Sequence, residues 1–131
     1  MPWAHDLVTL VALLSLLLYF YMGVRVGQAR YKTGVKAPAT AGHPDFERVY
    51  RVHYNTLEQL PIYLVSLYVF STYVQPLAAA GLGLVWIAGR VLFMLGYTKA
   101  AEKRSVGFAI SAVAMLLLFV GAIGGVVRSL V

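Results

Sequence analysis

The chain has 131 residues, of which 60% are hydrophobic and 12% are charged. Soluble domains carry about a quarter charged residues, so this composition predicts one integral membrane domain, residues 1–131, without room for a soluble domain. The absence of cysteine excludes disulfides, thiolate metal sites and a protein thiol nucleophile. His5, His43 and His53 are too scattered to form a metal centre, so we expect no metal.

Four apolar segments fill most of the chain and predict an all-α bundle of four transmembrane helices. The first run, Leu7–Val24, has about the length needed to cross a hydrocarbon core roughly 30 Å thick. Basic residues follow this run instead of preceding it, so we do not expect it to be a removable signal peptide. The predicted helices cover about residues 7–30, 44–74, 77–98 and 105–128.

The second predicted helix has a recognisable start and an internal proline. Pro44 suits the first helical position, and Asp45 and Glu47 follow in the first turn, where the helix dipole favours acids. His43 is therefore interpreted as a capping or loop residue. Pro61 would break a soluble helix but is tolerated in a packed membrane bundle, so we expect a kink there instead of a break.

The last predicted helix is rich in small residues and contains a Gly-x-x-x-Gly motif at Gly121–Gly125. Small residues allow membrane helices to approach closely, because lipid supplies no hydrophobic drive for their association. The motif is common in membrane helices, and we interpret it as a packing feature.

Basic residues lie mainly on one side of the predicted membrane. The positive-inside rule therefore predicts that both connections carrying them face the cytoplasm and that both termini face away from it. The net charge of +6 is then a topology signal, and we expect no nucleic-acid partner. The nine basic residues of these connections are Arg25, Arg30, Lys32, Lys36, Arg48, Arg51, Lys99, Lys103 and Arg104.

Polar residues at the mouth of the second predicted helix form a candidate site. Arg51, Asn55 and Glu58 have i, i+4, i+7 spacing, which places them on one helix face within about 60° of each other. Ionisable groups in a membrane helix are costly, so they mark either a binding site or a pair inside the bundle. A surface pair between Glu47 and Arg51 is a simpler explanation of those two charges.

Two further arginines have both structural and functional interpretations. Arg90 lies inside the third predicted helix, with Tyr97 on the same face, and either pairs with Glu58 or a neighbouring carbonyl or binds a ligand. Arg104 precedes the fourth helix, where free backbone N–H groups and the helix dipole favour an anion. Its alternative role is that of a basic topology anchor at the membrane surface.

Two stretches of the chain resemble a known family. The segments FERVYRVHYNTLEQLP (46–61) and GRVLFMLGYTKAAEKR (89–104) are similar to motifs of the membrane-associated proteins in eicosanoid and glutathione metabolism (MAPEG), of the microsomal glutathione transferase type. The similarity extends over nearly the whole chain. It implies a homotrimer of four-helix subunits that binds glutathione, as a cosubstrate, between neighbouring protomers near the cytosolic face.

The resemblance also implies roles for individual residues. By matching positions, Arg104 would stabilise the glutathione thiolate, and Arg90 would have a structural or secondary role. Three positions depart from the leukotriene-synthase-like members, which carry glutamine at His53 and tyrosines at Gln59 and Phe93. The residues that the resemblance implies as glutathione contacts are Arg30, Arg51, Asn55, Glu58 and Tyr97.

The favoured interpretation is a membrane-bound glutathione transferase that acts on lipophilic electrophiles, with reduction of lipid hydroperoxides as an additional activity to consider. Glutathione has two carboxylates, an ammonium and a thiol, and Arg51, Asn55 and Glu58 supply a cation, an amide and an acid. One alternative is a lipid-binding, non-enzymatic member of the family. Another is a small four-helix multidrug exporter, which would place its essential carboxylate in the first helix.

Overall fold

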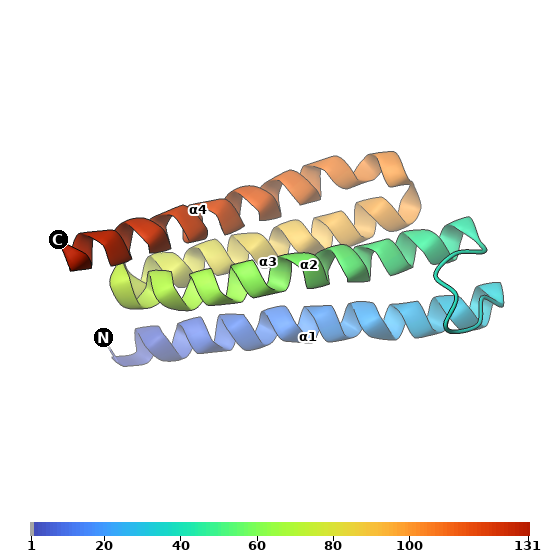
Figure 1. The fold of residues 1–131 in the computed structure, drawn as a ribbon. Helices are drawn as coiled ribbons and strands as arrows, with labels where there is room; N and C mark the ends of the chain where they lie inside the picture. The colour runs from blue at the N-terminus through green and yellow to red at the C-terminus, as the bar shows by residue number, and fades with distance from the viewer. Residues whose placement is uncertain (1) are drawn as a thin grey trace.

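The computed structural model describes residues 2–131, which fold into a bundle of four long helices. The helices alternate in direction, so α1 begins and α4 ends at the same end of the bundle (Figure 1). A short 3-10 turn, η1, joins α3 to α4 at the other end. The bounds are α1 Pro2–Thr33, α2 Pro44–Tyr73, α3 Pro76–Lys99, η1 Ala101–Arg104 and α4 Ser105–Leu130.

The largest difference from the predicted bounds is at α1, which extends past residues 7–30 at both ends. Hydropathy marks only the stretch that suits lipid, whereas the helix continues through the polar residues beside it. The start of α2 is as predicted, because His43 is the N-cap and its Nδ1 accepts from the Asp45 N–H over 3.1 Å. Pro61 lies within one continuous helix.

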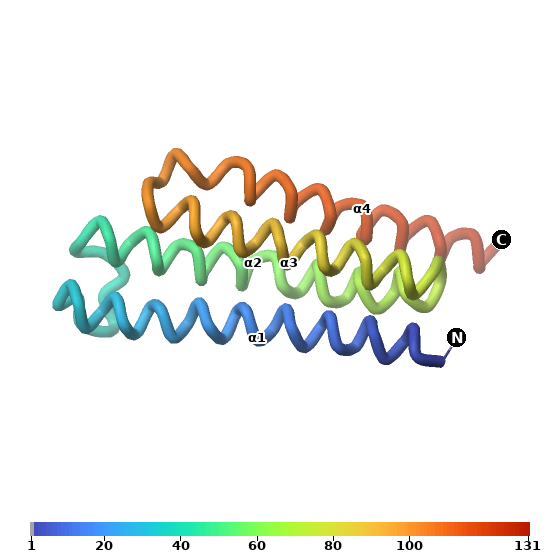
Figure 2. Tube along the Cα trace, turned by 180° about the vertical axis from the view of Figure 1, so that it is seen from behind, coloured from blue at the N-terminus to red at the C-terminus, as the bar shows by residue number. Residues whose placement is uncertain are grey.

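α2 and α3 form the centre of the bundle, since each of them contacts all three other long helices. α1 and α4 lie on opposite sides of the α2–α3 pair in both views (Figures 1 and 2). In the core, Tyr63 of α2 stacks on Trp86 of α3 with ring centroids 3.9 Å apart. The Gly-x-x-x-Gly motif packs within this chain, since Gly121 and Gly125 face Phe70 and Tyr73 of α2.

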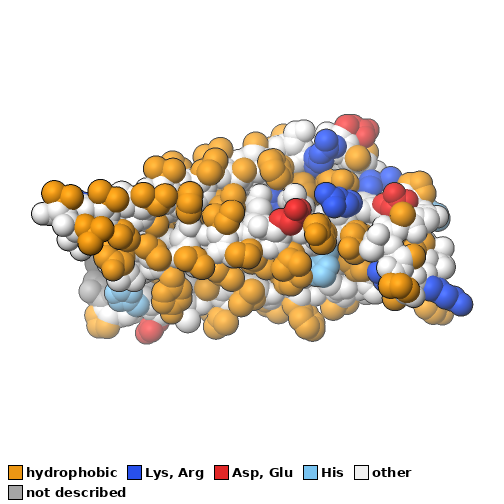
Figure 3. Space-filling model, viewed as in Figure 1, with side chains coloured by type: hydrophobic (Ala, Val, Ile, Leu, Met, Phe, Trp, Pro, Cys, Tyr) orange, Lys and Arg blue, Asp and Glu red, His pale blue; other side chains and the backbone are white. Residues whose placement is uncertain are grey.

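Three helical segments are long and apolar enough to cross a membrane: α1, α3 and Ala101–Leu130. α2 is as long, but charged residues occupy its first half. Figure 3 shows apolar side chains over most of the visible face, with most charged groups at the end where α1 connects to α2 and α3 to α4. This distribution matches a membrane protein with one strongly basic end.

Candidate functional site

A small cavity opens at the charged end of the bundle, where α2, α3 and the start of α4 meet. Its volume is about 170 Å³. Five of the residues singled out in the sequence line it, and the sequence analysis did not identify the sixth, Phe108. The lining residues are Arg51, Asn55, Phe93, Tyr97, Arg104 and Phe108.

Helical spacing explains why these six side chains converge. Each of three consecutive segments contributes two residues four positions apart, so that both lie on the same helix face, one turn from each other. The pairs are Arg51 and Asn55, Phe93 and Tyr97, and Arg104 and Phe108. The cavity therefore has cationic, amide and aromatic walls, and its lining contains no acidic group.

Arg104 is the N-cap residue of α4, as predicted from its position in the sequence. Its Nη1 donates to the Ala101 carbonyl over 2.6 Å, and its guanidinium carbon lies 5.8 Å from the centre of the Tyr97 ring. An arginine side chain has no acceptor and makes no capping hydrogen bond here. No side chain therefore caps the start of α4, where the helix dipole favours an anion next to the guanidinium.

The polar wall on α2 combines an exposed cation with a half-buried amide. Arg51 is exposed, and its guanidinium carbon lies 5.5 Å from the centre of the Tyr54 ring. The alternative of a surface pair between Glu47 and Arg51 is not found: the ion pair recorded within residues 2–131 joins other side chains, and Glu47 accepts from the backbone N–H of Gly42 at 3.2 Å. Arg51 is therefore free of that pairing at the edge of the cavity.

Arg90 is fully buried behind this wall, and it donates hydrogen bonds to three uncharged side-chain oxygens. Its Nη1 donates to Asn55 Oδ1 over 2.8 Å and to Thr56 Oγ1 over 3.2 Å. Its Nε and Nη2 donate to Ser111 Oγ over 3.0 and 2.8 Å. The predicted pairing with Glu58 is wrong, since Glu58 is an exposed side chain outside this buried network.

Sequence reasoning did not find Thr56 and Ser111, although both are fully buried. The sequence signal that could have indicated them is an arginine deep in an apolar segment, because such a group needs hydrogen-bond acceptors. A hydroxyl residue on each of the two neighbouring helices could supply them. Which hydroxyls meet the arginine depends on helix rotation and depth, and helix periodicity does not determine either across separate helices.

The other predicted contact on α2, Glu58, does not line the cavity. It lies almost one turn beyond Asn55, and its side chain is exposed. Within residues 2–131 the structure records one ion pair, between Arg48 and Asp45, so Glu58 has no cationic partner there.

Arg30 lies away from the cavity, at the connection between α1 and α2. Its Nη1 donates to the carbonyls of Ala39 and Val35 over 2.7 and 3.5 Å, and its guanidinium carbon lies 4.7 Å from the centre of the Phe46 ring. Arg30 thus holds the connecting loop against the start of α2.

Two of the three departures from the family pattern also lie outside the cavity. His53 stacks on Tyr19 of α1, with ring centroids 4.5 Å apart. Gln59 is buried, and its Oε1 accepts from the Trp86 indole N–H over 3.0 Å. Phe93, by contrast, lines the cavity, at a position where the resemblance implies a tyrosine in leukotriene-synthase-like members.

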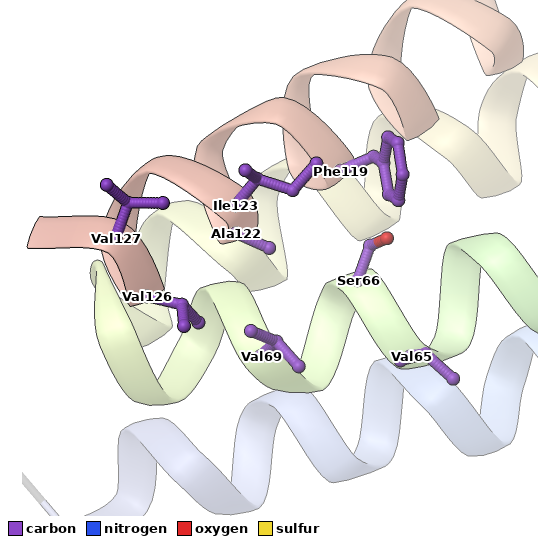
Figure 4. Close-up of a pocket in the computed structure, with 8 residues that line it drawn as sticks. All are labelled: Val65, Ser66, Val69, Phe119, Ala122, Ile123, Val126 and Val127. Carbon is purple, nitrogen blue, oxygen red and sulfur yellow. The ribbon is translucent and has the colours of Figure 1, made fainter. Parts of the chain in front are cut away.

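A second, apolar groove lies between α2 and α4, towards the opposite end of the bundle (Figure 4). Its volume is about 280 Å³, and its lining includes Val65, Ser66, Phe119 and Ile123. Fifteen residues of helix separate Arg104 from Phe119, which corresponds to about 22 Å along α4. This groove is therefore separate from the polar cavity at the charged end.

The chain is similar to known proteins over nearly its whole length. The model of the MAPEG family matches residues 8–124. An uncharacterized protein of Synechocystis sp. is 51% identical over 114 residues, which cover 87% of this chain and 83% of that protein. Microsomal glutathione S-transferase 2 of Homo sapiens is 41% identical over 119 residues, covering 90% and 81%. Leukotriene C4 synthase of Cavia porcellus is 39% identical over 112 residues, covering 86% and 75%.

Proposed function

Because this chain belongs to the MAPEG family, we propose that it is a membrane-bound glutathione transferase that conjugates glutathione to lipophilic electrophiles. The names of its relatives include glutathione S-transferase and leukotriene C4 synthase. The observation that carries the proposal is the cavity that joins Arg51, Asn55, Tyr97 and Arg104 at the basic end of the bundle.

The cavity suits the anionic groups of glutathione. Arg51 and the Asn55 amide are donors for a carboxylate, and charge-assisted hydrogen bonds of this kind are roughly twice as strong as neutral ones. The ammonium group of glutathione needs an acidic partner, and Glu58, next along the same helix, is the residue we assign to it.

We assign to Arg104 the stabilisation of the glutathione thiolate. A guanidinium about 4 Å from the sulfur contributes up to ~4 kcal/mol at an effective dielectric constant of 20. If the thiol pKa falls by about 2 units, the thiolate fraction at neutral pH rises roughly 25-fold, while nucleophilicity falls nearly 10-fold. The net gain is about threefold, so most of the rate must come from holding the electrophile beside the sulfur.

We further propose a homotrimer with glutathione bound between neighbouring subunits. Ligand cavities usually measure about 300–1,000 Å³, and this one is smaller. Arg30 and Glu58 lie outside it within one subunit, so a neighbour is needed for all predicted contacts to meet. In this arrangement α2 is the fourth membrane span, the site is near the cytoplasmic face, and both termini are on the opposite side.

The same bound thiolate supports a second reaction. With a lipid hydroperoxide, two glutathione molecules would give the lipid alcohol, water and glutathione disulfide. We regard this peroxidase activity as secondary to conjugation.

Isothermal titration of the detergent-solubilised protein with glutathione tests the proposal directly. We expect saturable binding, and conjugate formation when a lipophilic model electrophile is added. Binding without either reaction would favour a lipid-binding, non-enzymatic member of the family. Absence of glutathione binding to a correctly assembled protein would contradict the proposed function and return the exporter alternative to consideration.

A further inference from the structure

We propose that Arg90 is a positioning residue of the glutathione site, which fixes the direction of the Asn55 amide and places an uncompensated positive charge behind the cavity wall. This inference rests on the proposed function, because the ligand it concerns is glutathione. Arg90 itself does not line the cavity.

The first step of the argument is the charge of Arg90. The side chain is fully buried, and the partners that it holds, Asn55, Thr56 and Ser111, are all neutral. The one ion pair recorded in residues 2–131 involves other side chains. A buried charge without a counterion is unfavourable, and an apolar side chain would serve a purely structural role better. An anion bound in the adjacent cavity would compensate this charge.

The second step is the direction of the Asn55 amide. Arginine only donates hydrogen bonds, so the group that Asn55 turns toward Arg90 must be its carbonyl oxygen, Oδ1. The amide NH₂ of Asn55 is then directed away from the guanidinium. Because Asn55 also lines the cavity, its NH₂ is the group left for a ligand. Arg90 thereby selects a hydrogen-bond acceptor, such as a carboxylate, at this position.

The third step is the closeness of Arg90 to the cavity. Its guanidinium carbon lies 4.3 Å from the ring centre of Phe93 and 5.8 Å from that of Phe108. Both rings line the cavity, so the charge is separated from a bound ligand by little more than an aromatic wall. Such a low-dielectric barrier screens the charge weakly.

Ser111 holds the other side of the guanidinium. Its Oγ accepts from Nε and Nη2 of Arg90, and its hydroxyl can donate to the carbonyl of Gly107 or Phe108, each 3.1 Å away. Ser111 does not line the cavity. Its removal therefore disturbs Arg90 without deleting a ligand contact.

The test compares Ser111→Ala with Ser15→Ala. Both serines are fully buried, and Ser15 shares its hydrogen bond with Tyr63, outside the cavity lining. We expect Ser111→Ala to weaken glutathione binding about 3- to 10-fold, the equivalent of one hydrogen bond, with turnover at saturating glutathione nearly unchanged. Ser15→Ala should keep the wild-type Kd. Binding would be measured by isothermal titration and turnover with a model electrophile.

Asn55→Asp gives a second and independent readout. A carboxylate at this position neutralises Arg90 and removes the NH₂ donor, so we expect glutathione binding to be lost while the thermal midpoint Tm stays at or above that of wild type. A purely structural Arg90 would leave Kd unchanged in Ser111→Ala, and that result overturns the inference. A lowered Tm in Asn55→Asp would also overturn it. Failure of the wild-type protein to bind glutathione would instead overturn the proposed function, and this inference with it.

Discussion

Gln59 of α2 and Trp86 of α3 are joined by a hydrogen bond of 3.0 Å from the indole N–H to Oε1. The ring of Trp86 also stacks on that of Tyr63. Gln59, where the resemblance implies a tyrosine in leukotriene-synthase-like members, is therefore part of the core. We expect Gln59→Leu to lower the free energy of unfolding by about 1–3 kcal/mol, because the buried indole N–H loses its partner. Glutathione affinity should remain unchanged. Thermal unfolding and isothermal titration measure the two effects, and a clear rise in Kd would place Gln59 in the site.

Glu58→Gln tests an exposed carboxylate that lies outside the cavity of one subunit. If Glu58 accepts the glutathione ammonium, the variant should bind glutathione more weakly by roughly 1.5 to 3 kcal/mol, the value of a charged hydrogen bond. Glu102→Gln is the matched control, since Glu102 is also an exposed acid at the basic end. Equal affinities in a correctly assembled Glu58 variant and its control would exclude the assigned contact.

Arg104→Ala tests the chemical step. We expect glutathione affinity at neutral pH to fall only about fourfold, as a thiol pKa shift of about 2 units implies, together with loss of the ultraviolet absorbance of the bound thiolate and slower conjugation. The thiol pKa should rise toward about 8.5, the value of a free thiol, so the pH–rate profile should shift to higher pH. Arg104→Lys should recover part of the effect, because lysine keeps the charge but not the planar fork of donors.

Arg128→Ala serves as the control for Arg104→Ala, since it removes an exposed arginine from the other end of α4. An identical pH dependence of thiolate formation in wild type and Arg104→Ala would show that Arg104 is only a topology anchor. In the proposed trimer, Arg30 of a neighbouring subunit would then become the candidate for thiolate stabilisation.

Gly107→Ala tests the close contact between α3 and α4. A Cβ at this position would meet the backbone of Phe93, so the two helices would have to separate next to the cavity. Overpacking of this kind costs about 1–3 kcal/mol, and we expect weaker glutathione binding as well. Gly124→Ala is the matched control on the same helix, because nothing lies within 4 Å of its added methyl group. Equal Tm and Kd values in the two variants would contradict the prediction.

Mass measurement in detergent or nanodiscs tests the assembly. We expect a trimer as the species that binds glutathione, because one subunit leaves Arg30 and Glu58 outside its small cavity. A stable monomer with full activity would contradict the proposed intersubunit site.

The helices and the charged end of the bundle could be predicted from the sequence. The apolar runs indicate the helices, and the residues between them indicate which ends carry charge. His43 and Pro44 mark the start of α2 through local geometry alone. Likewise, Arg51 and Asn55 share a face because helical periodicity is a local property. These features depend on residues close together in the chain, so the sequence by itself determines them.

Only the tertiary structure decided which side chains from separate helices meet. The rotation and depth of one helix against another depend on packing, such as the approach of Gly107 to Phe93. That packing places Ser111 against Arg90, where the sequence suggested Glu58. A buried guanidinium must satisfy its donors with the acceptors that lie within reach, and three-dimensional packing, not spacing along the chain, determines which acceptors those are.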